Sequence, residues 1–82
     1  MEVVIYTKDD CNWCVKAKQL MNQIGMKYTE RKLGVDYTRE DLRDIIPENL
    51  PLKVPQIFVD SHRIGGYEDF AEWCDNHGYG NE

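Results

Sequence analysis

The chain has 82 residues, of which 41 % are hydrophobic and 30 % are charged, and its net charge at pH 7 is −5. This size and balance predict a single folded domain over residues 1–82 and exclude disorder and a second hydrophobic core. The cationic side chains are scattered, with Arg31-Lys32 as the longest run, so binding to nucleic acid or to an anionic membrane surface is not expected.

Targeting signals are not evident in the sequence. No apolar run approaches the roughly 20 residues that cross a bilayer. Residues 1–6 carry no basic segment and no small-residue cleavage site. We therefore expect no membrane association, no signal peptide and a cytoplasmic location. The three cysteines are an odd number, which does not suit a secreted disulfide scaffold and indicates a redox or metal site in a reducing compartment.

The first third of the chain predicts a strand, a helix and a second strand. Residues 3–6 are a continuous apolar run, typical of a strand buried on both faces. From residue 12 to residue 24 the apolar side chains recur at helical spacing, and Gly25 suits the end of that helix. Weak alternation over residues 26–33 predicts the second strand. The apolar stripe of the helix consists of Trp13, Ala17, Leu20, Met21 and Ile24.

A second helix is predicted from a capping signal. Thr38 and Asp41 have the spacing of a capping box, with Asp in place of the usual Glu. We expect the helix to begin there and to end at about Pro47, which cannot continue it. Its apolar side chains are Leu42, Ile45 and Ile46.

The last third predicts a hairpin followed by a helix. Residues 56–59 form the third strand, and a tight turn at residues 60–61 leads to a short fourth strand around residues 63–64. After Gly65-Gly66, a last helix runs from Tyr67 to near Gly78. The order β-α-β-α-β-β-α predicts an α/β three-layer sandwich, with a four-stranded mixed sheet covered by helices on both faces.

Cys11 and Cys14 form a C-x-x-C motif where the first strand gives way to the first helix. This spacing puts both sulfurs on one helical turn, within bonding reach. Cys11 precedes the helix, where unpaired N–H groups and the helix dipole favour the thiolate that attacks disulfides. Lys8 adds positive charge, and Asp9-Asp10 oppose it. We expect the helix and Lys8 to prevail, so that Cys11 is the catalytic nucleophile and Cys14 the resolving thiol.

Two other interpretations of the motif remain open. In the first, the two cysteines are inert core residues. In the second, they are half of a zinc site that Cys74, His62 and His77 complete. No second C-x-x-C or H-x3-H accompanies them, and Cys74 falls on the apolar stripe of the last helix, as a small core residue would. We therefore expect no metal, and we expect both histidines to be exposed bystanders.

Three separated segments resemble the glutaredoxin family, and the match covers nearly the whole chain. Residues 4–14 are similar to the family's strand, lysine and C-x-x-C, residues 54–59 to its T-V-P-x-x-F stretch, and residues 64–70 to its G-G-x-x-D helix start. The resemblance implies a thioredoxin-like fold and a glutathione-dependent thiol–disulfide oxidoreductase. The short C-terminal end looks like the compact bacterial and bacteriophage members; for a phage protein the location would be the host cytoplasm.

The resemblance also implies a glutathione site beside Cys11. The bond before Pro55 is expected to be cis, so that the Val54 backbone pairs with a substrate backbone like an added strand. Lys8 is similar to the lysine that meets the glycyl carboxylate, with Arg39 as a further charge partner, and free N–H groups of the last helix would hold the second carboxylate. The residues assigned to glutathione are Lys8, Trp13, Val54, Pro55, Gly66, Glu68 and Asp69.

The chain departs from the family pattern at two places. The family's usual motif is C-P-Y-C, whereas here Asn12 and Trp13 stand between the cysteines. Asn12 restores the backbone N–H that proline lacks near the helix start, and Trp13 keeps an aromatic side chain beside the sulfur. The threonine before Val54 is replaced by Lys53, which adds positive charge near the site.

The implied partners are glutathione and proteins that are glutathionylated or disulfide-bonded, among them ribonucleotide reductase, and the protein is expected to be a monomer. Two other functions stay open. One is a thioredoxin-like reductant served by a flavoprotein reductase. The other is an iron–sulfur-binding glutaredoxin, although the lone cysteine of a C-G-F-S motif is not found here.

Overall fold

The computed structural model describes residues 1–79, and the last three residues of the expected domain, 80–82, lie outside the described part. Four strands and three helices follow one another in the order that the sequence predicts, β-α-β-α-β-β-α. The elements are β1 (Val3–Thr7), α1 (Asn12–Gln23), β2 (Thr29–Lys32), α2 (Arg39–Ile45), β3 (Gln56–Val59), β4 (His62–Gly65) and α3 (Tyr67–Asn76).

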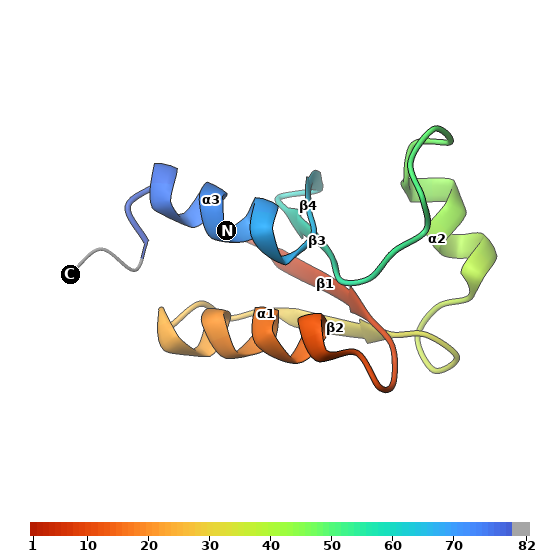
Figure 1. Ribbon diagram of the computed structural model, residues 1–82, viewed down its shortest axis with the longest axis horizontal. Coiled ribbons are helices and arrows are strands. Elements are labelled where there is room, and N and C mark those ends of the chain that lie inside the picture. Colours follow the sequence, from red (N-terminus) through yellow and green to blue (C-terminus); the bar gives the residue numbers. More distant parts are fainter. Residues whose placement is uncertain (80–82) are drawn as a thin grey trace.

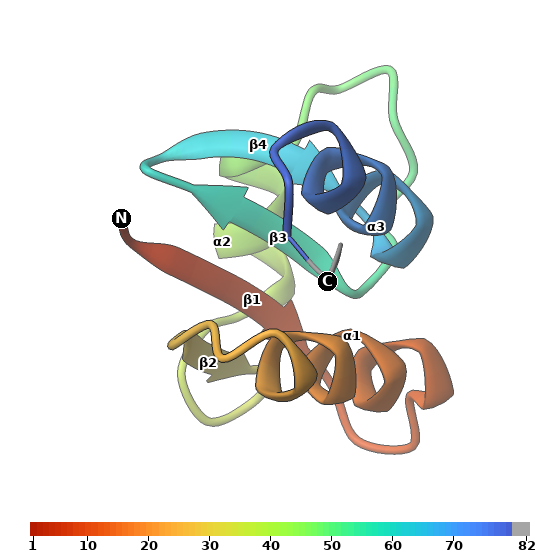
Figure 2. The same cartoon turned by 90° about the vertical axis from the view of Figure 1, so that its left-hand side faces the viewer.

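The strands form one mixed sheet in the order β2-β1-β3-β4. β1 runs parallel to β2, as a helical crossover requires, and antiparallel to β3, which pairs in turn with β4 as a hairpin. The helices α1 and α3 lie together on one face of the sheet, and α2 lies on the other (Figures 1 and 2). The three-layer α/β architecture is therefore confirmed.

Each face of the sheet packs its own hydrophobic core, because neighbouring side chains of a strand point to opposite faces. In β1, Val3 and Ile5 pack toward α1 and α3, whereas Tyr6 packs toward α2. The core under α2 is small, since Tyr37, Leu42 and Ile46 are its buried members in the described chain. The buried members of the larger core are Val3, Ile5, Ala17, Met21, Met26, Ile57, Val59, Phe70 and Cys74.

Two side chains of the predicted apolar stripes are not buried in the cores. Trp13 belongs to the helical stripe by spacing, yet it is 49 % exposed, because its ring packs against the half-buried Tyr67 instead of entering the core. Ile45 is 40 % exposed, since the seven-residue α2 turns only Leu42 fully inward. The helix α1 also stops at Gln23, one residue earlier than predicted, with Ile24 as its C-cap.

The second strand is shorter than predicted. β2 covers four residues instead of eight and has an exposed pattern, because it is the edge strand of the sheet. The buried Met26, which suggested the start of a strand, lies before β2, where its backbone N–H donates to Met21 O at the end of α1.

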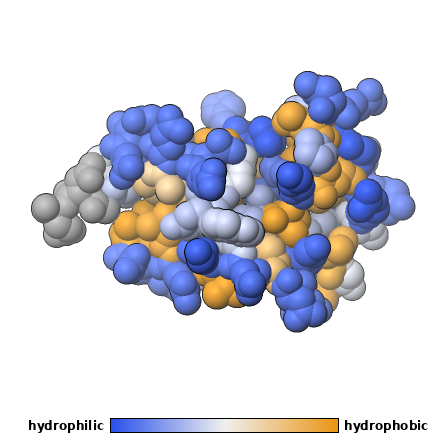
Figure 3. Space-filling view, viewed as in Figure 1, coloured by the Kyte–Doolittle hydropathy of each residue, from blue (hydrophilic) through white to orange (hydrophobic). Residues whose placement is uncertain are grey.

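Hydrophilic side chains cover most of the molecular face seen in Figure 3, with hydrophobic surface visible between α1 and α3 and around α2. Within residues 1–79, no helix is long and apolar enough to cross a membrane.

The predicted capping box at the start of α2 is present. Thr38 Oγ1 accepts the Asp41 N–H at 3.2 Å, and an Asp41 carboxylate oxygen accepts the Thr38 N–H at 2.9 Å. These two bonds satisfy N–H groups that have no acceptor inside the helix. They matter because the small core beneath α2 gives this short helix little other support.

Replacing Thr38 by Ala should lower the free energy of unfolding by about 1 kcal/mol, the usual cost of a lost N-cap. Urea denaturation followed by circular dichroism measures this loss. Thr38→Ser keeps the hydroxyl and should stay close to the parent protein. Equal loss in both variants would mean that the cap does not stabilise α2.

Candidate active site

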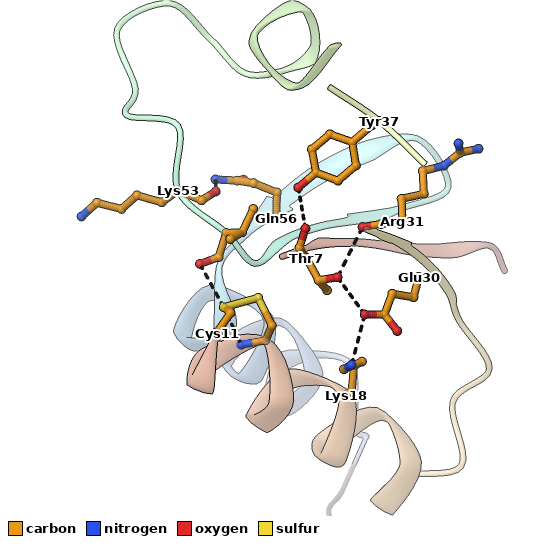
Figure 4. Close-up of a disulfide and its surroundings, with 10 residues drawn as sticks. Thr7, Cys11, Lys18, Glu30, Arg31, Tyr37, Lys53 and Gln56 are labelled. Atoms are coloured by element: carbon orange, nitrogen blue, oxygen red, sulfur yellow. Dashed lines mark hydrogen bonds and ion pairs between the residues drawn. A yellow bond between two sulfur atoms is a disulfide. The ribbon is translucent and has the colours of Figure 1, made fainter. Parts of the chain in front are cut away.

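Cys11 and Cys14 are joined by a disulfide across the first turn of α1 (Figure 4). Cys11 is the N-cap residue, with extended backbone, and its Sγ accepts the Cys14 N–H at 3.2 Å. Cys14 is buried, with 2 % of its surface exposed, whereas Cys11 is half-buried. A substrate disulfide can therefore reach the Cys11 sulfur first, at a helix terminus whose N–H groups stabilise negative charge.

The turn that carries Cys11 is anchored at the end of β1 by the buried Thr7. The Thr7 carbonyl oxygen accepts a hydrogen bond from the Tyr37 hydroxyl at 2.7 Å, and the Thr7 hydroxyl donates one to the Glu30 carboxylate at 2.7 Å (Figure 4). The Thr7 hydroxyl, with Lys18 at 3.1 Å from the same carboxylate, holds the pKa of Glu30 below its usual range, although partial burial opposes this. Burial raises the pKa of the Tyr37 hydroxyl, which is the donor in the bond to Thr7. Thr7 thus ties β1 to β2 and to the α2 side of the sheet just before the active-site loop.

The acidic residues near Cys11 are partly neutralised. Asp9 forms an ion pair with Lys32 at 2.6 Å, and this pair raises the pKa of the lysine. Lys8 forms no ion pair with any carboxylate of residues 1–79. The positive charge of Lys8 is therefore left for an anionic ligand, while Asp9 opposes the Cys11 thiolate less than its position in sequence suggests.

The loop before β3 lies against the disulfide. The Val54–Pro55 peptide bond is cis, as expected, and the Val54 carbonyl oxygen is 3.8 Å from Cys11 Sγ. The two residues stand 43 positions apart in the sequence. Their proximity puts an open backbone edge beside the reactive sulfur, where an extended peptide can add like a strand.

Two grooves meet at Val54. The first has a volume of 290 Å³ and contains three cations, Lys8, Arg39 and Lys53, with no carboxylate among its lining residues. Such a concentration of positive charge on a chain of net charge −5 indicates an anion-binding surface. The apolar part of its lining is Leu33, Tyr37, Leu42, Leu52 and Val54.

The second groove, of 360 Å³, has mixed charge and lies between the disulfide and the start of α3. Its charged residues are the cations Lys53 and Arg63 and the carboxylates Glu68 and Asp69. Trp13 and Tyr67 form an aromatic wall, with ring centroids 5.5 Å apart. The remaining lining residues are Val54, Pro55 and Gly66.

Gly65 permits the close approach that shapes this second groove. Its φ of +128° is strained for any residue with a side chain, and a Cβ here would collide with the Asp69 carboxylate. That carboxylate accepts the Gly66 N–H at 3.3 Å, which caps α3. The following N–H groups in the first turn, those of Glu68 and Asp69, have no acceptor within the helix and suit an anion.

All the residues predicted to bind glutathione lie along the two grooves. Lys8 and Arg39 line the cationic groove, Val54 lines both, and the others line the mixed-charge groove. Sequence reasoning missed Tyr67 and Arg63. A signal for both was present, since they flank the Ile64-Gly65-Gly66 segment on its two sides.

The residues of the zinc alternative lie elsewhere. Cys74 is buried in the larger core, and this burial raises the pKa of its thiol. His62 and His77 are exposed, and neither lines either groove beside the disulfide. In the part of the chain that the structure describes, no three His, Cys, Asp or Glu side chains gather in a way that could hold a metal ion.

Known proteins are similar to this chain in sequence and in fold. The Glutaredoxin family model matches residues 3–64. Glutaredoxin 1 of Escherichia coli K12 is 39 % identical over 81 residues, covering 89 % of this chain and 92 % of its own, and Glutaredoxin 3 of the same strain is 37 % identical over 67 residues, covering 82 % and 78 %. The structure of reduced E. coli glutaredoxin superimposes with a TM-score of 0.76 at 36 % identity, covering 93 % of this chain and 95 % of that one.

The region that the family model matches contains the Cys11–Cys14 pair and the whole cationic groove, and it ends before the part of the mixed-charge groove formed by residues 66–69. The shared fold is thioredoxin-like. The chain therefore belongs to the glutaredoxin family, as a thiol–disulfide oxidoreductase with a two-cysteine active site.

Proposed function

We propose that the protein uses glutathione to reduce protein disulfides and mixed disulfides between proteins and glutathione. One observation carries the proposal: Cys11 Sγ lies 3.8 Å from the carbonyl oxygen of Val54, the residue at which a groove with three cations meets a groove of mixed charge. Glutathione has a lone carboxylate at its glycyl end and both an ammonium and a carboxylate at its γ-glutamyl end. Its charges therefore match the two grooves in one orientation.

In that orientation the glycyl carboxylate enters the cationic groove and meets Lys8, Arg39 and Lys53. The γ-glutamyl end enters the mixed-charge groove, where α3 begins. Its carboxylate meets free N–H groups of Glu68 and Asp69, and its ammonium meets their side-chain carboxylates. Trp13 covers the ligand beside the sulfur, and the Val54 backbone pairs with the central cysteine residue.

The reaction is thiol–disulfide exchange. With a glutathionylated protein, the Cys11 thiolate attacks the glutathione sulfur, the substrate disulfide breaks, and the protein thiolate leaves and takes a proton from water. A glutathione thiolate then attacks the glutathione sulfur held on Cys11. This step releases glutathione disulfide and restores the Cys11 thiolate.

With a protein disulfide, the first attack leaves the substrate bound to Cys11 and frees its other thiolate. Cys14 loses its proton and attacks the Cys11 sulfur, which forms the Cys11–Cys14 disulfide and releases the reduced protein. Two glutathione molecules then reduce this disulfide and leave as glutathione disulfide. The net reaction consumes two glutathione molecules for each substrate disulfide.

Three further proposals concern the oligomeric state, the cellular location and one protein substrate. We propose a single-domain monomer over residues 1–82 that works in the cytoplasm and reduces ribonucleotide reductase among its substrates. The supporting argument is chemical: such an enzyme forms a cysteine disulfide at each turnover and needs a small dithiol donor. Deoxyribonucleotide formation with glutathione, with and without this protein, tests the client, and analytical ultracentrifugation tests the monomer.

The two cysteines should differ in their effect on activity. Cys11→Ser should abolish turnover of both substrate types, because it removes the attacking sulfur. Cys14→Ser should retain much of the activity on a glutathionylated peptide and lose that on a protein disulfide, which needs the resolving thiol. A glutathione assay coupled to glutathione reductase measures both. Activity that survives in Cys11→Ser but not in Cys14→Ser would reverse the assigned roles.

The cationic groove should determine affinity for the substrate. Lys8→Gln and Arg39→Gln should each raise the KM for a glutathionylated peptide by about 5- to 10-fold, as expected for the loss of a charge-assisted hydrogen bond of about 1–1.5 kcal/mol. The matched control is Lys27→Gln, at an exposed lysine that lines neither groove. An equal effect of Lys27→Gln would show that overall charge, not this groove, governs binding.

A further inference from the structure

Gln56, the first residue of β3, has a polar side chain almost completely buried, with 4 % of its surface exposed. A buried amide needs partners for both of its ends. Its Nε2 donates to the Lys53 carbonyl oxygen at 2.8 Å, and its Oε1 accepts from Arg63 Nε at 3.1 Å. The amide thus joins the neighbouring strand β4 to the loop that carries Val54 (Figure 4 shows the contact with Lys53).

The chemistry of the two partners fixes which way the amide faces. The Lys53 carbonyl can only accept a hydrogen bond, and the Arg63 guanidinium can only donate. Arg63 therefore holds the amide oxygen, and this leaves the amide nitrogen for Lys53. A flipped amide would set two acceptors against each other at Lys53 and two donors against each other at Arg63, so both partners oppose it, and without Arg63 only the Lys53 carbonyl does.

Holding the Lys53 carbonyl also orients the Val54 N–H. The two groups belong to one planar peptide unit, and this unit is trans, because the cis bond in residues 1–79 is the next one along the chain. In a trans unit the C=O and N–H point in opposite directions. Since the carbonyl is held inward by the buried Gln56, the Val54 N–H is directed outward, and within residues 1–79 it has no acceptor.

We propose that Gln56 and Arg63 are positioning residues that direct the Val54 N–H toward a backbone carbonyl of the bound substrate. The proposal rests on the proposed function and specifies how its binding site is held. Val54 is the residue whose carbonyl oxygen lies 3.8 Å from Cys11 Sγ, so the directed N–H fixes a peptide beside the attacking sulfur. Neither positioning residue takes part in the chemical step.

The test compares two oxidants of the reduced protein. Glutathione disulfide has peptide carbonyls that can accept the Val54 N–H, whereas bis(2-hydroxyethyl) disulfide has no peptide backbone. Stopped-flow tryptophan fluorescence gives the rate constant with each oxidant. The quantity of interest is the rate constant with glutathione disulfide divided by the rate constant with bis(2-hydroxyethyl) disulfide. A loss of folded protein lowers the signal amplitude with both oxidants and leaves this ratio unchanged.

Gln56→Leu should lower the ratio of the two rate constants by about 5-fold, the effect of one lost hydrogen bond of about 1 kcal/mol. Gln56→Glu should lower it at least as much, because a carboxylate still accepts from Arg63 but cannot donate to Lys53. Arg63→Lys keeps the charge and one donor and should fall between these variants and the parent. The matched control is Gln23→Leu, at an exposed glutamine at the end of α1, and it should leave the ratio unchanged.

The outcomes separate the two proposals. If the parent protein prefers glutathione disulfide and both Gln56 variants keep that preference, the positioning role is overturned and the proposed function stands. If the parent protein shows no preference for glutathione disulfide, the proposed function fails, and the positioning role fails with it.

Discussion

The Cys14 N–H donates to the Cys11 sulfur where α1 begins, and the rest of the molecule serves to place that sulfur. A helix terminus offers unpaired N–H groups and a positive dipole end, which stabilise the thiolate needed for disulfide exchange. The βαβ crossover supplies such a terminus at the end of a central strand, β1. Cys14, one turn further into α1, is buried and stays within bonding reach of Cys11.

A reactive sulfur also needs a surface that recognises its substrate, and here the chain assembles one from distant segments. The loop before β3, the start of α3 and the residues around α2 line grooves that meet at Val54, whose carbonyl oxygen lies 3.8 Å from Cys11 Sγ. Polar contacts hold these segments in place: Tyr37 with Thr7 behind the active-site loop, and Gln56 with Lys53 behind Val54. The resulting grooves differ in charge, and the proposed orientation of glutathione rests on this difference.

Patterns among residues close together in the sequence predicted the fold and the position of the reactive cysteines. The spacing of Cys11 and Cys14, the Thr38 capping box and the order of elements depend on residues close together in the chain, and these predictions agree with the structure. The family resemblance predicted that Val54 lies beside Cys11, but other contacts between distant residues could not be predicted. The pairing of Gln56 with Arg63 depends on how β3 and β4 pair. The pairing of Asp9 with Lys32 depends on where the loop after β1 passes the end of β2. The exposure of Trp13 depends on its contact with Tyr67, which is far away in the sequence.

The pH dependence of Cys11 alkylation in Cys14→Ser tests the central claim most directly, because that variant leaves one sulfur at the start of α1. If the helix terminus stabilises the thiolate, the alkylation rate should reach half its maximum well below pH 8.5, about the pKa of a free cysteine. Lys8→Gln in the same background should move the midpoint upward. A midpoint at or above that of free cysteine would contradict the account, since the fold would then give the sulfur no advantage.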